Sequence, residues 1–476
     1  MLFYDAKQKH KMPRPPKINS SDLELIIGAR GPVSASDLAS QLNVNRTTIV
    51  RTLDDIGDNL VTLGNTRSTR YVLRRRVMTS GNSWPIYMMN EKGRASDWAT
   101  LEALHDQKWR IEWADNPPDW AGEFSDQYGI WEGFPFFLSD LKPQGFLGRV
   151  IAQNLAPQLG LPEDIRRWSD DHTIQFLRTA GEDLPGAIVM GDDCLRRIQA
   201  VNAAENSGHF VEESERSQRF PEIAETAMNS EPGSSAGGEQ PKFLTTITGA
   251  ESPRPVLVKF SPPLSQPTGQ RWADLLVCEE IALNTLSRQG LAIKGARILD
   301  AGNRRFLEVP RFDRSGANGR RGVVSLGALY PESYGDNQAS AWTNAARNLL
   351  QQEFISASTF ATIQKLSAFG DLIGNTDKHA GNLAFWLTHS VPFEITPAYD
   401  MLPMVWAPSA QGEIVERVFT PTPPLPNARE HWREAVEWAI GFWETVTSDT
   451  RISDPFRILS EEVLSAVKAL RKHEQD

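Results

Sequence analysis

One stretch, residues 370–403, sets polar side chains between short apolar runs at a spacing that limits what the surrounding chain can form. It opens as GDLIGNTDKHAGNLAFW and closes as PAYDMLP. Asp377 is followed five positions later by Asn382, and a second isolated acid, Asp400, comes after two short apolar runs. An acid and an Asn from one loop and an acid from the next strand-loop supply one base and two Mg²⁺ ligands, which suits phosphoryl transfer.

An amphipathic helix is the alternative explanation for the spacing of these acids. It does not explain why four polar residues crowd into one segment between apolar runs: Asn375, Asp377, His379 and Asn382. We expect Asn375 and His379 to hold the loop by hydrogen bonds rather than to act as acids or bases.

The chain of 476 residues is long enough for two or three domains, and its hydrophobic content of 40% is ordinary for a globular protein. No apolar run approaches the roughly 18 residues of a membrane span, and the N-terminal residues lack the apolar core of a signal peptide. Cys194 and Cys278 are far apart and lack partners at metal-ligand spacing. We expect a protein of the reducing cytoplasm that is neither exported nor embedded in a membrane.

Positive charge is concentrated at the start of the chain. Residues 1–80 contain 13 Lys and Arg against 7 Asp and Glu, although the whole chain has a net charge of -10. A basic module ahead of an acidic body indicates that only the first part meets nucleic acid.

Residues 1–18 are polar and contain prolines, which predicts a flexible lead. Residues 19–76 give three helical patterns and then two strands around a turn, the arrangement of a winged helix-turn-helix. Ser34 or Ser36 can cap the second helix. The candidate DNA contacts lie on the third helix and on the wing, at Asn45, Arg46, Thr47, Thr48, Arg51, Arg67 and Arg70. A module for protein contacts, whose arginines form a solvated face, is the alternative.

Residues 77–230 give weaker signals. Aromatic-rich pieces between residues 84 and 149 predict strands of an irregular sheet, and residues 140–162 and 168–178 predict helices. The Glu-rich run 211–231 predicts an exposed helix or a linker.

A Gly-containing loop, EPGSSAGGEQPK, then precedes an apolar strand, and the next strand carries Lys259. Backbone N–H groups at Gly237 and Gly238 can approach phosphate oxygens, and Lys259 can pair with those oxygens. The loop matches neither GxGxxG nor GxxxxGK[ST], so alone it is also explained as a flexible turn. Loop and strands together are the layout of a nucleotide-binding small lobe.

The helical stretch 271–291 follows where a kinase places the Glu that orients the strand Lys. We expect Glu280 to be that partner, with Glu279 as the alternative. Glu308 begins a hinge-like Glu-Val-Pro and is a candidate cofactor contact. From Ala341 onward the pattern is mostly helical and predicts an α-rich large lobe built around residues 354–369, 431–443 and 454–473.

With these pieces in order, the chain resembles the HipA family of bacterial serine/threonine kinases, the toxin halves of HipA–HipB toxin–antitoxin systems. More narrowly, it resembles the YjjJ-type branch, which has its own N-terminal DNA-binding domain. Four stretches carry the resemblance, namely SSAGGEQPK, VLVKF, PRFDR and the pair NTDKHAGN with PAYDML.

The resemblance implies an α+β protein with a winged helix-turn-helix at 19–76, a β-rich small lobe at 77–310 and an all-helical catalytic lobe at 311–476. It implies a kinase that uses ATP and Mg²⁺ to phosphorylate protein hydroxyls. The roles that the resemblance assigns are a base at Asp377, Mg²⁺ ligands at Asn382 and Asp400, a phosphate ligand at Lys259, and autophosphorylated serines of the Gly-rich loop at Ser234 or Ser235.

The resemblance also implies a protein substrate, DNA, a HipB-like antitoxin and a homodimer as partners, in a cytoplasmic protein that joins the nucleoid when bound to DNA. Typical members rely on a separate DNA-binding antitoxin, so the fused winged helix puts the existence of that antitoxin in doubt. Two other functions stay open, a small-molecule kinase and a transcription regulator whose kinase-like body only senses nucleotide. Asp377 argues against a pure sensor, because a sensor has no need of a base.

Overall fold

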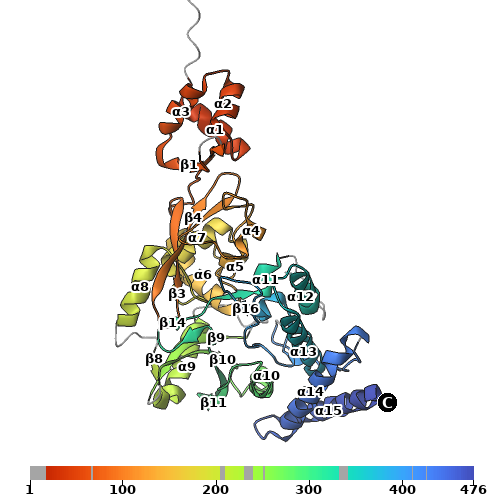
Figure 1. Ribbon diagram of the computed structural model, residues 1–476. Coiled ribbons are helices and arrows are strands. Elements are labelled where there is room, and N and C mark those ends of the chain that lie inside the picture. Colours follow the sequence, from red (N-terminus) through yellow and green to blue (C-terminus); the bar gives the residue numbers. More distant parts are fainter. Residues whose placement is uncertain are drawn as a thin grey trace, which may run out of the picture. The chain divides into compact units, whose positions relative to one another are not determined.

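The computed structural model describes residues 18–65, 68–203, 210–229, 240–249, 252–331, 341–409, 411–424 and 426–475. The chain divides into two compact units. The first comprises Met1–Ser83, Leu101–Glu112 and Ser125–Gly133, and the second comprises Trp84–Thr100, Trp113–Phe124 and Phe134–Asp476. Figure 1 shows the elements of both units.

The first unit contains the winged helix-turn-helix that the sequence predicts. Its helices are α1 (Ser20–Arg30), α2 (Ala35–Leu42) and α3 (Arg46–Asp54), and its wing is the antiparallel pair β1 (Leu60–Leu63) and β2 (Arg70–Leu73). Ser34 caps α2, since its hydroxyl accepts from Asp37 N at 3.1 Å and the Asp37 carboxylate accepts in return from Ser34 N. Leu23, Ile49 and Leu53 are among the buried residues that join the helices into one core.

The aromatic-rich region forms a five-stranded sheet, as expected from the alternation of apolar runs and turns. The strands are β3 (Ser83–Met89), β4 (Ala95–Ala103), β5 (Trp109–Trp113), β6 (Ile130–Trp131) and β7 (Ile188–Met190), in the order β6-β5-β4-β3-β7. Helices α4 (Ala121–Phe124), α5 (Phe136–Ser139), α6 (Gly145–Leu159), α7 (Asp170–Ala180) and α8 (Asp192–Ala203) lie between or after these strands in the chain. The predicted helices at 140–162 and 168–178 correspond to α6 and α7.

A second five-stranded sheet carries Lys259. Its strands are β8 (Phe210–Glu212), β9 (Lys242–Thr248), β10 (Arg254–Phe260), β11 (Arg297–Ala301) and β12 (Arg304–Pro310), in the order β11-β12-β10-β9-β8. Helix α9 (Arg216–Asn229) covers one face, where Phe220 packs with Phe243 and Phe306. The Glu-rich run is therefore a helix, but it is not simply exposed, because its apolar side completes the core of this sheet.

Helix α10 (Pro267–Arg288) packs against this sheet and contacts β10, β11 and β12. Alternate side chains of β10 point to opposite faces of the sheet. Val258 and Phe260 enter the core under α9, so Lys259 points to the other face, where it meets a residue of α10.

The rest of the chain is mostly helical, with two short strand pairs. Strands β13 (Arg314–Ser315) and β14 (Gly319–Arg320) form a hairpin, and β15 (Val323–Ser325) pairs with β16 (Ala384–Trp386). The helices are α11 (Leu326–Leu329), α12 (Ala341–Gln351), α13 (Ala357–Ile373), α14 (Arg429–Ser448) and α15 (Asp454–Gln475). The last three confirm the predicted helices, and Trp443 of α14 donates to Leu372 O of α13 at 3.1 Å. No helix in the part of the chain that is described is long and apolar enough to cross a membrane.

Candidate functional site

The loop that carries Asp377 and Asn382 begins where α13 ends. Gly374 closes α13 in the left-handed conformation, with φ of 75°. A side chain there would be strained, and its Cβ would lie 2.9 Å from Val405. The glycine therefore allows the chain to turn sharply out of the helix and into the loop.

Asn375 connects this loop to the segment of Asp400. Its Oδ1 accepts from Asp377 N at 3.0 Å, and its Nδ2 donates to Asp400 O at 3.2 Å. Asp400 itself has φ of 53°, an uncommon conformation for a residue other than Gly. One buried amide thus fixes the backbone beside both acids.

Asn382 is held from within the loop. It ends the short turn Ala380–Asn382, and its Nδ2 donates to Asp377 O at 2.9 Å. Because the nitrogen of the amide is used in this bond, its oxygen is the atom that remains for a cation. His379 Nδ1 accepts from Gly381 N at 3.1 Å, and Lys378 is directed back to α13, where Nζ pairs with Asp371 Oδ1 at 2.6 Å.

Lys259 joins the sheet to this loop. Its Nζ donates to Glu279 Oε1 at 2.6 Å and forms a second ion pair with Asp400. The side chains of Lys259 and Glu279 are only 3% and 1% exposed. A buried lysine shared by two carboxylates brings together residues 141 positions apart in the chain.

The charges of this cluster shift one another's pKa values. Burial would raise the pKa of Asp400, but Lys259 and Lys242 outweigh it and hold that pKa below its ordinary value. Burial would lower the pKa of Lys259, whereas Asp400 and Glu279 raise it above its ordinary value. Lys259 and Asp400 are therefore both charged at neutral pH.

The side chain of Asp377 reaches solvent, unlike those of Lys259 and Glu279. Desolvation by the surrounding protein raises its pKa, Asp400 raises it further, and His379 opposes both effects. A carboxylate with a raised pKa is a better proton acceptor than an ordinary one.

The expectation that Glu280 pairs with Lys259 is wrong, and the alternative, Glu279, is the partner. Neighbouring side chains on a helix point about 100° apart, so only one of the two acids can face the sheet lysine. Glu280 instead pairs with Arg451 at 2.6 Å and accepts from Ile298 N at 3.3 Å.

The cofactor contact predicted at Glu308 stays a prediction, and the structure places the side chain of Glu308 away from Lys259. Glu308 lies opposite Val258 in the register of β12 with β10, so it faces α9 rather than α10. Its carboxylate is buried between Arg216 and Arg254, at 3.0 and 2.6 Å.

Sequence reasoning gave no role to Lys242, which belongs to the site. Lys242 lies directly opposite Lys259 in the register of β9 with β10, so both side chains leave the same face of the sheet. Its charge contributes to the low pKa of Asp400. The signal was present in the sequence, because Lys242 closes the motif SSAGGEQPK.

The residues present fit a nucleotide with Mg²⁺. Buried Glu279 Oε2 and Gln240 Nε2 have no hydrogen-bond partner in the described structure. Glu279 contacts Lys259, and Gln240 lies two residues before Lys242. Among the described residues no group of three His, Cys, Asp or Glu side chains can hold a metal ion alone. A Mg²⁺ ion at Asp400 and Asn382 would complete its shell with phosphate oxygens and water, as Mg²⁺ usually does.

The Gly-rich loop lies outside the described residues, and with it the predicted sites Ser234, Ser235, Gly237 and Gly238. In the winged helix, Arg67 is also outside the described residues.

The DNA-contact candidates on α3 and at its N-cap are all exposed, at Asn45, Arg46, Thr47, Thr48 and Arg51. Arg70 pairs with Asp37 at 3.1 Å, and its side chain remains 40% exposed.

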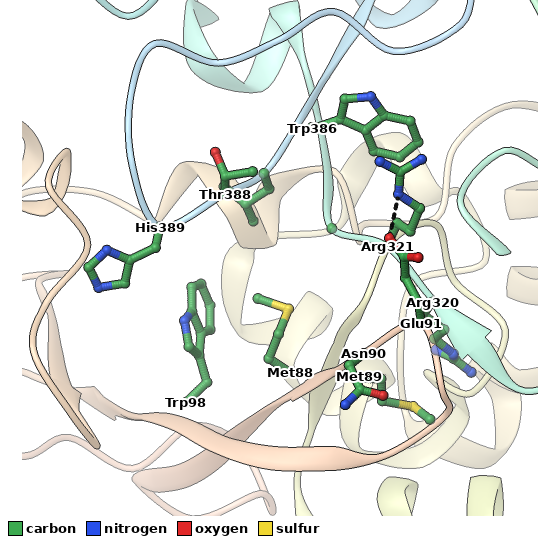
Figure 2. Close-up of a pocket in the computed structure, with 12 residues that line it drawn as sticks. Met88, Met89, Asn90, Glu91, Trp98, Arg320, Arg321, Trp386, Thr388 and His389 are labelled. Atoms are coloured by element: carbon green, nitrogen blue, oxygen red, sulfur yellow. Dashed lines mark ion pairs between the residues drawn. The ribbon is translucent and has the colours of Figure 1, made fainter. Parts of the chain in front are cut away.

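A separate cavity of about 370 Å³ contains none of the predicted site residues (Figure 2). Its walls come from the end of β3 and the adjoining turn, from residues 320–322, and from residues 386–389. Arg321 lies over the ring of Trp386, 3.6 Å from its centroid, and pairs with Glu91 at 3.1 Å. The ion pair connects Arg321 to the turn after β3, and the ring contact connects it to β16, the strand that follows the Asp377 loop.

Three family models match the chain. Residues 20–68 match a helix-turn-helix domain, residues 80–199 match the middle domain of YjjJ-like toxins, and residues 234–468 match the HipA-like C-terminal domain. The helix-turn-helix match covers all three helices and the first strand of the wing.

The solved structures that align with the chain include a toxin–antitoxin complex and a kinase. The HipA–HipB–operator DNA complex of Shewanella oneidensis MR-1 aligns with a TM-score of 0.48 and 17% identity, over 81% of this chain and 97% of that chain. The proinflammatory kinase CtkA of Helicobacter pylori aligns with a TM-score of 0.34 and 13% identity, over 48% and 90%.

A curated relative extends over almost the whole length. The toxin YjjJ of Escherichia coli (strain K12) is 34% identical over 447 residues, which cover 93% of this chain and 96% of that protein. With a helix-turn-helix domain, a YjjJ-type middle domain and a HipA-like C-terminal domain in the same order, the chain belongs to the family of YjjJ-like toxins.

Proposed function

We propose that this protein is an ATP-dependent protein serine/threonine kinase with its own DNA-binding domain. One observation carries the proposal, namely the ion pairs of Lys259 with both Glu279 and Asp400, beside a loop that presents Asp377 and Asn382. A lysine oriented by a helix Glu, a base and two oxygen ligands for Mg²⁺ are what phosphoryl transfer requires of a protein.

Each residue has a distinct task in this proposal. Asp377 orients the acceptor hydroxyl and takes its proton, which its raised pKa favours. Lys259 and Lys242 neutralise phosphate charge, and Asn382 Oδ1 and the Asp400 carboxylate hold Mg²⁺. When bound, ATP with Mg²⁺ supplies the phosphoryl group and the charge that stabilises its transfer.

Binding of a nucleotide with Mg²⁺ must break the ion pair between Lys259 and Asp400. Lys259 is paired with Asp400, and a cation at Asp400 would compete for the same carboxylate. We expect Lys259 to keep its contact with Glu279 and to turn its remaining N–H groups to phosphate.

The Gly-rich loop would provide control by autophosphorylation at Ser234 or Ser235. A phosphoserine adds about two negative charges next to a site that receives phosphates, so repulsion would disfavour nucleotide binding. Incubation with ATP and Mg²⁺ should add the mass of one phosphate to the chain, and Ser234→Ala or Ser235→Ala should remove it. An unmodified wild type that still phosphorylates other proteins would reject autophosphorylation and leave the kinase proposal standing.

The winged helix would bring the kinase to DNA. The exposed face of α3 carries Arg46 and Arg51, and the N-terminus of α3 has no side-chain cap. Both features suit the phosphates and base edges of a major groove. From the HipA-like C-terminal domain and the helix-turn-helix domain together, we propose four partners for this chain: DNA, a HipB-like antitoxin, a second copy of the chain and a protein substrate. We propose that it meets them in the cytoplasm.

A further inference from the structure

The helix that carries Glu279 is held by the C-terminal helices. The loop between α14 and α15, residues 449–453, contacts α10 at two points six residues apart. Arg451 pairs with Glu280 at 2.6 Å, and Ser453 donates to Asp274 from both its N and its Oγ, at 2.8 and 2.6 Å. Two anchors on one helix fix both its rotation and its position along its axis.

The first anchor is a network rather than an isolated ion pair. Arg451 also pairs with Asp449 at 2.7 Å, and its carbonyl oxygen accepts from Arg305 at 2.8 Å. Arg305 lies on β12, so the same loop contacts the sheet that bears Lys259. The Glu280 side chain is 11% exposed, which makes its charge costly to leave without a partner.

Glu280 and Glu279 are neighbours, so the two ion pairs are mechanically coupled. A rotation of α10 that released Glu280 from Arg451 would carry Glu279 away from Lys259, because side chains on a helix turn together. Helix α10 is buried along most of its length, at Leu275, Leu276 and Cys278 among others, so it has few alternative positions.

We propose that Arg451 and Glu280 are positioning residues that hold α10 so that Glu279 orients Lys259. Neither residue touches the proposed nucleotide site. The inference rests on the proposed function, and it places the control of Lys259 in the α14–α15 loop. The helix that aligns the lysine is set by the C-terminal helices as well as by the sheet.

The kinetic test uses Arg451→Gln, Glu280→Gln and the double variant. Misplacement of a catalytic group by about 1 Å costs up to about 100-fold in rate, so each single variant should lower the turnover of phosphoryl transfer at saturating MgATP by roughly 10-fold or more. The double variant should be no slower than either single variant, because both remove the same contact. Arg451→Lys should restore part of the rate, since it keeps a cation opposite Glu280.

Arg471→Gln is the matched control. Arg471 pairs with Glu437 at 3.1 Å and so joins α15 to α14, the two helices on either side of the Arg451 loop. Its side chain is 38% exposed, the same as that of Arg451. It does not contact α10, so its loss should leave turnover unchanged. Equal turnover in Arg451→Gln and wild type, or additive losses in the double variant, would overturn the proposal.

A second measurement needs no kinase activity. Cys278 is fully buried in α10, and Cys194 is fully buried in α8. Modification by a thiol reagent, followed by mass spectrometry, should label Cys278 faster in Arg451→Gln and Glu280→Gln, with Cys194 unchanged. Arg471→Gln should not have this effect. If wild type transfers no phosphate but Cys278 responds as stated, the proposed function fails while the positioning holds. If Cys278 does not respond in folded variants, the positioning fails.

Discussion

At the scale of single residues, the polar set Asn375, Asp377, Asn382 and Asp400 was identifiable from the sequence because its members stand between apolar runs. The structure adds why they stay in place. Asn375 bonds the backbone at both acids, and Asn382 bonds the backbone at Asp377. The choice between Glu279 and Glu280 could not be made from sequence, since it depends on a rotation of about 100° of a helix whose phase is set by tertiary contacts.

We expect Lys242 to contribute to the binding of MgATP. Replacing it by Met removes a charge directly opposite Lys259 and should weaken MgATP binding by about 10- to 100-fold, the value of a hydrogen bond to a charged group. Titration calorimetry with MgATP measures the dissociation constant. Lys294→Met is the control, because Lys294 is exposed and lies outside the strands of the sheet. Equal weakening in both variants would argue against a specific role.

At the scale of elements, the helices of the C-terminal part and the strands around Lys259 follow from their periodicity. The packing of α9 against the sheet was not predicted. Its sequence is rich in charge, but Phe220 and Ala224 are buried and Ile223, Ala227 and Met228 pack beside them. Phe243 and Phe306 of the strands belong to the same core. Local composition reported the solvent side of the helix and missed the packed side.

The motif PRFDR, residues 310–314, connects two elements that are distant in the chain. Asp313 accepts from Gly186 N at 2.9 Å and pairs with Arg311 and Arg314 at 3.0 and 2.6 Å. The end of β12 is thereby fastened to the turn before β7. Burial would raise the pKa of Asp313, but Arg311 and Arg314 outweigh it and hold that pKa well below 3.8.

A lowered pKa stabilises the folded state at a pH above the unfolded value of 3.8, and this contribution is lost as the pH falls below that value. Asp313→Asn should therefore lower the free energy of unfolding at pH 7 by about 3–5 kcal/mol, as for other broken buried ion pairs. Its stability should then fall less than that of wild type on acidification through pH 4. Urea unfolding over a pH series measures both effects. Asp454→Asn, at an exposed pair with Arg457, should follow wild type, and parallel curves for Asp313→Asn would contradict this explanation.

At the scale of the whole molecule, the order of domains was predictable from the change of charge near residue 80 and from the order of the motifs. Where the compact units divide was not. Leu101–Glu112 and Ser125–Gly133 belong to the unit of the winged helix, although they follow strands of the other unit in the chain. No local pattern predicts this division, because it depends on the bridge of Arg74 with Leu104 and on the packing of Leu104 and Ile130 with residues of the wing.

DNA binding gives a prediction for the molecule. Arg46→Ala and Arg51→Ala should each weaken binding to DNA and reduce by about one the slope of log affinity against log salt, if each contacts one phosphate. Fluorescence anisotropy with labelled duplex at several salt concentrations gives the slope. Arg433→Ala, at an exposed position of α14, is the matched loss of charge and should change neither quantity. An unchanged slope in both α3 variants would show that this face does not meet phosphate.

The central claim is that Asp377 is the base of a phosphoryl transfer from ATP. The most direct measurement compares wild type, Asp377→Asn and Asp454→Asn for incorporation of labelled γ-phosphate into protein in the presence of Mg²⁺. The Asn variant keeps the shape of the side chain and removes its basicity, and loss of a general base costs roughly 100- to 10,000-fold. We predict that loss for Asp377→Asn, with wild-type binding of MgATP and wild-type rates for Asp454→Asn. Wild-type incorporation by Asp377→Asn would contradict the claim.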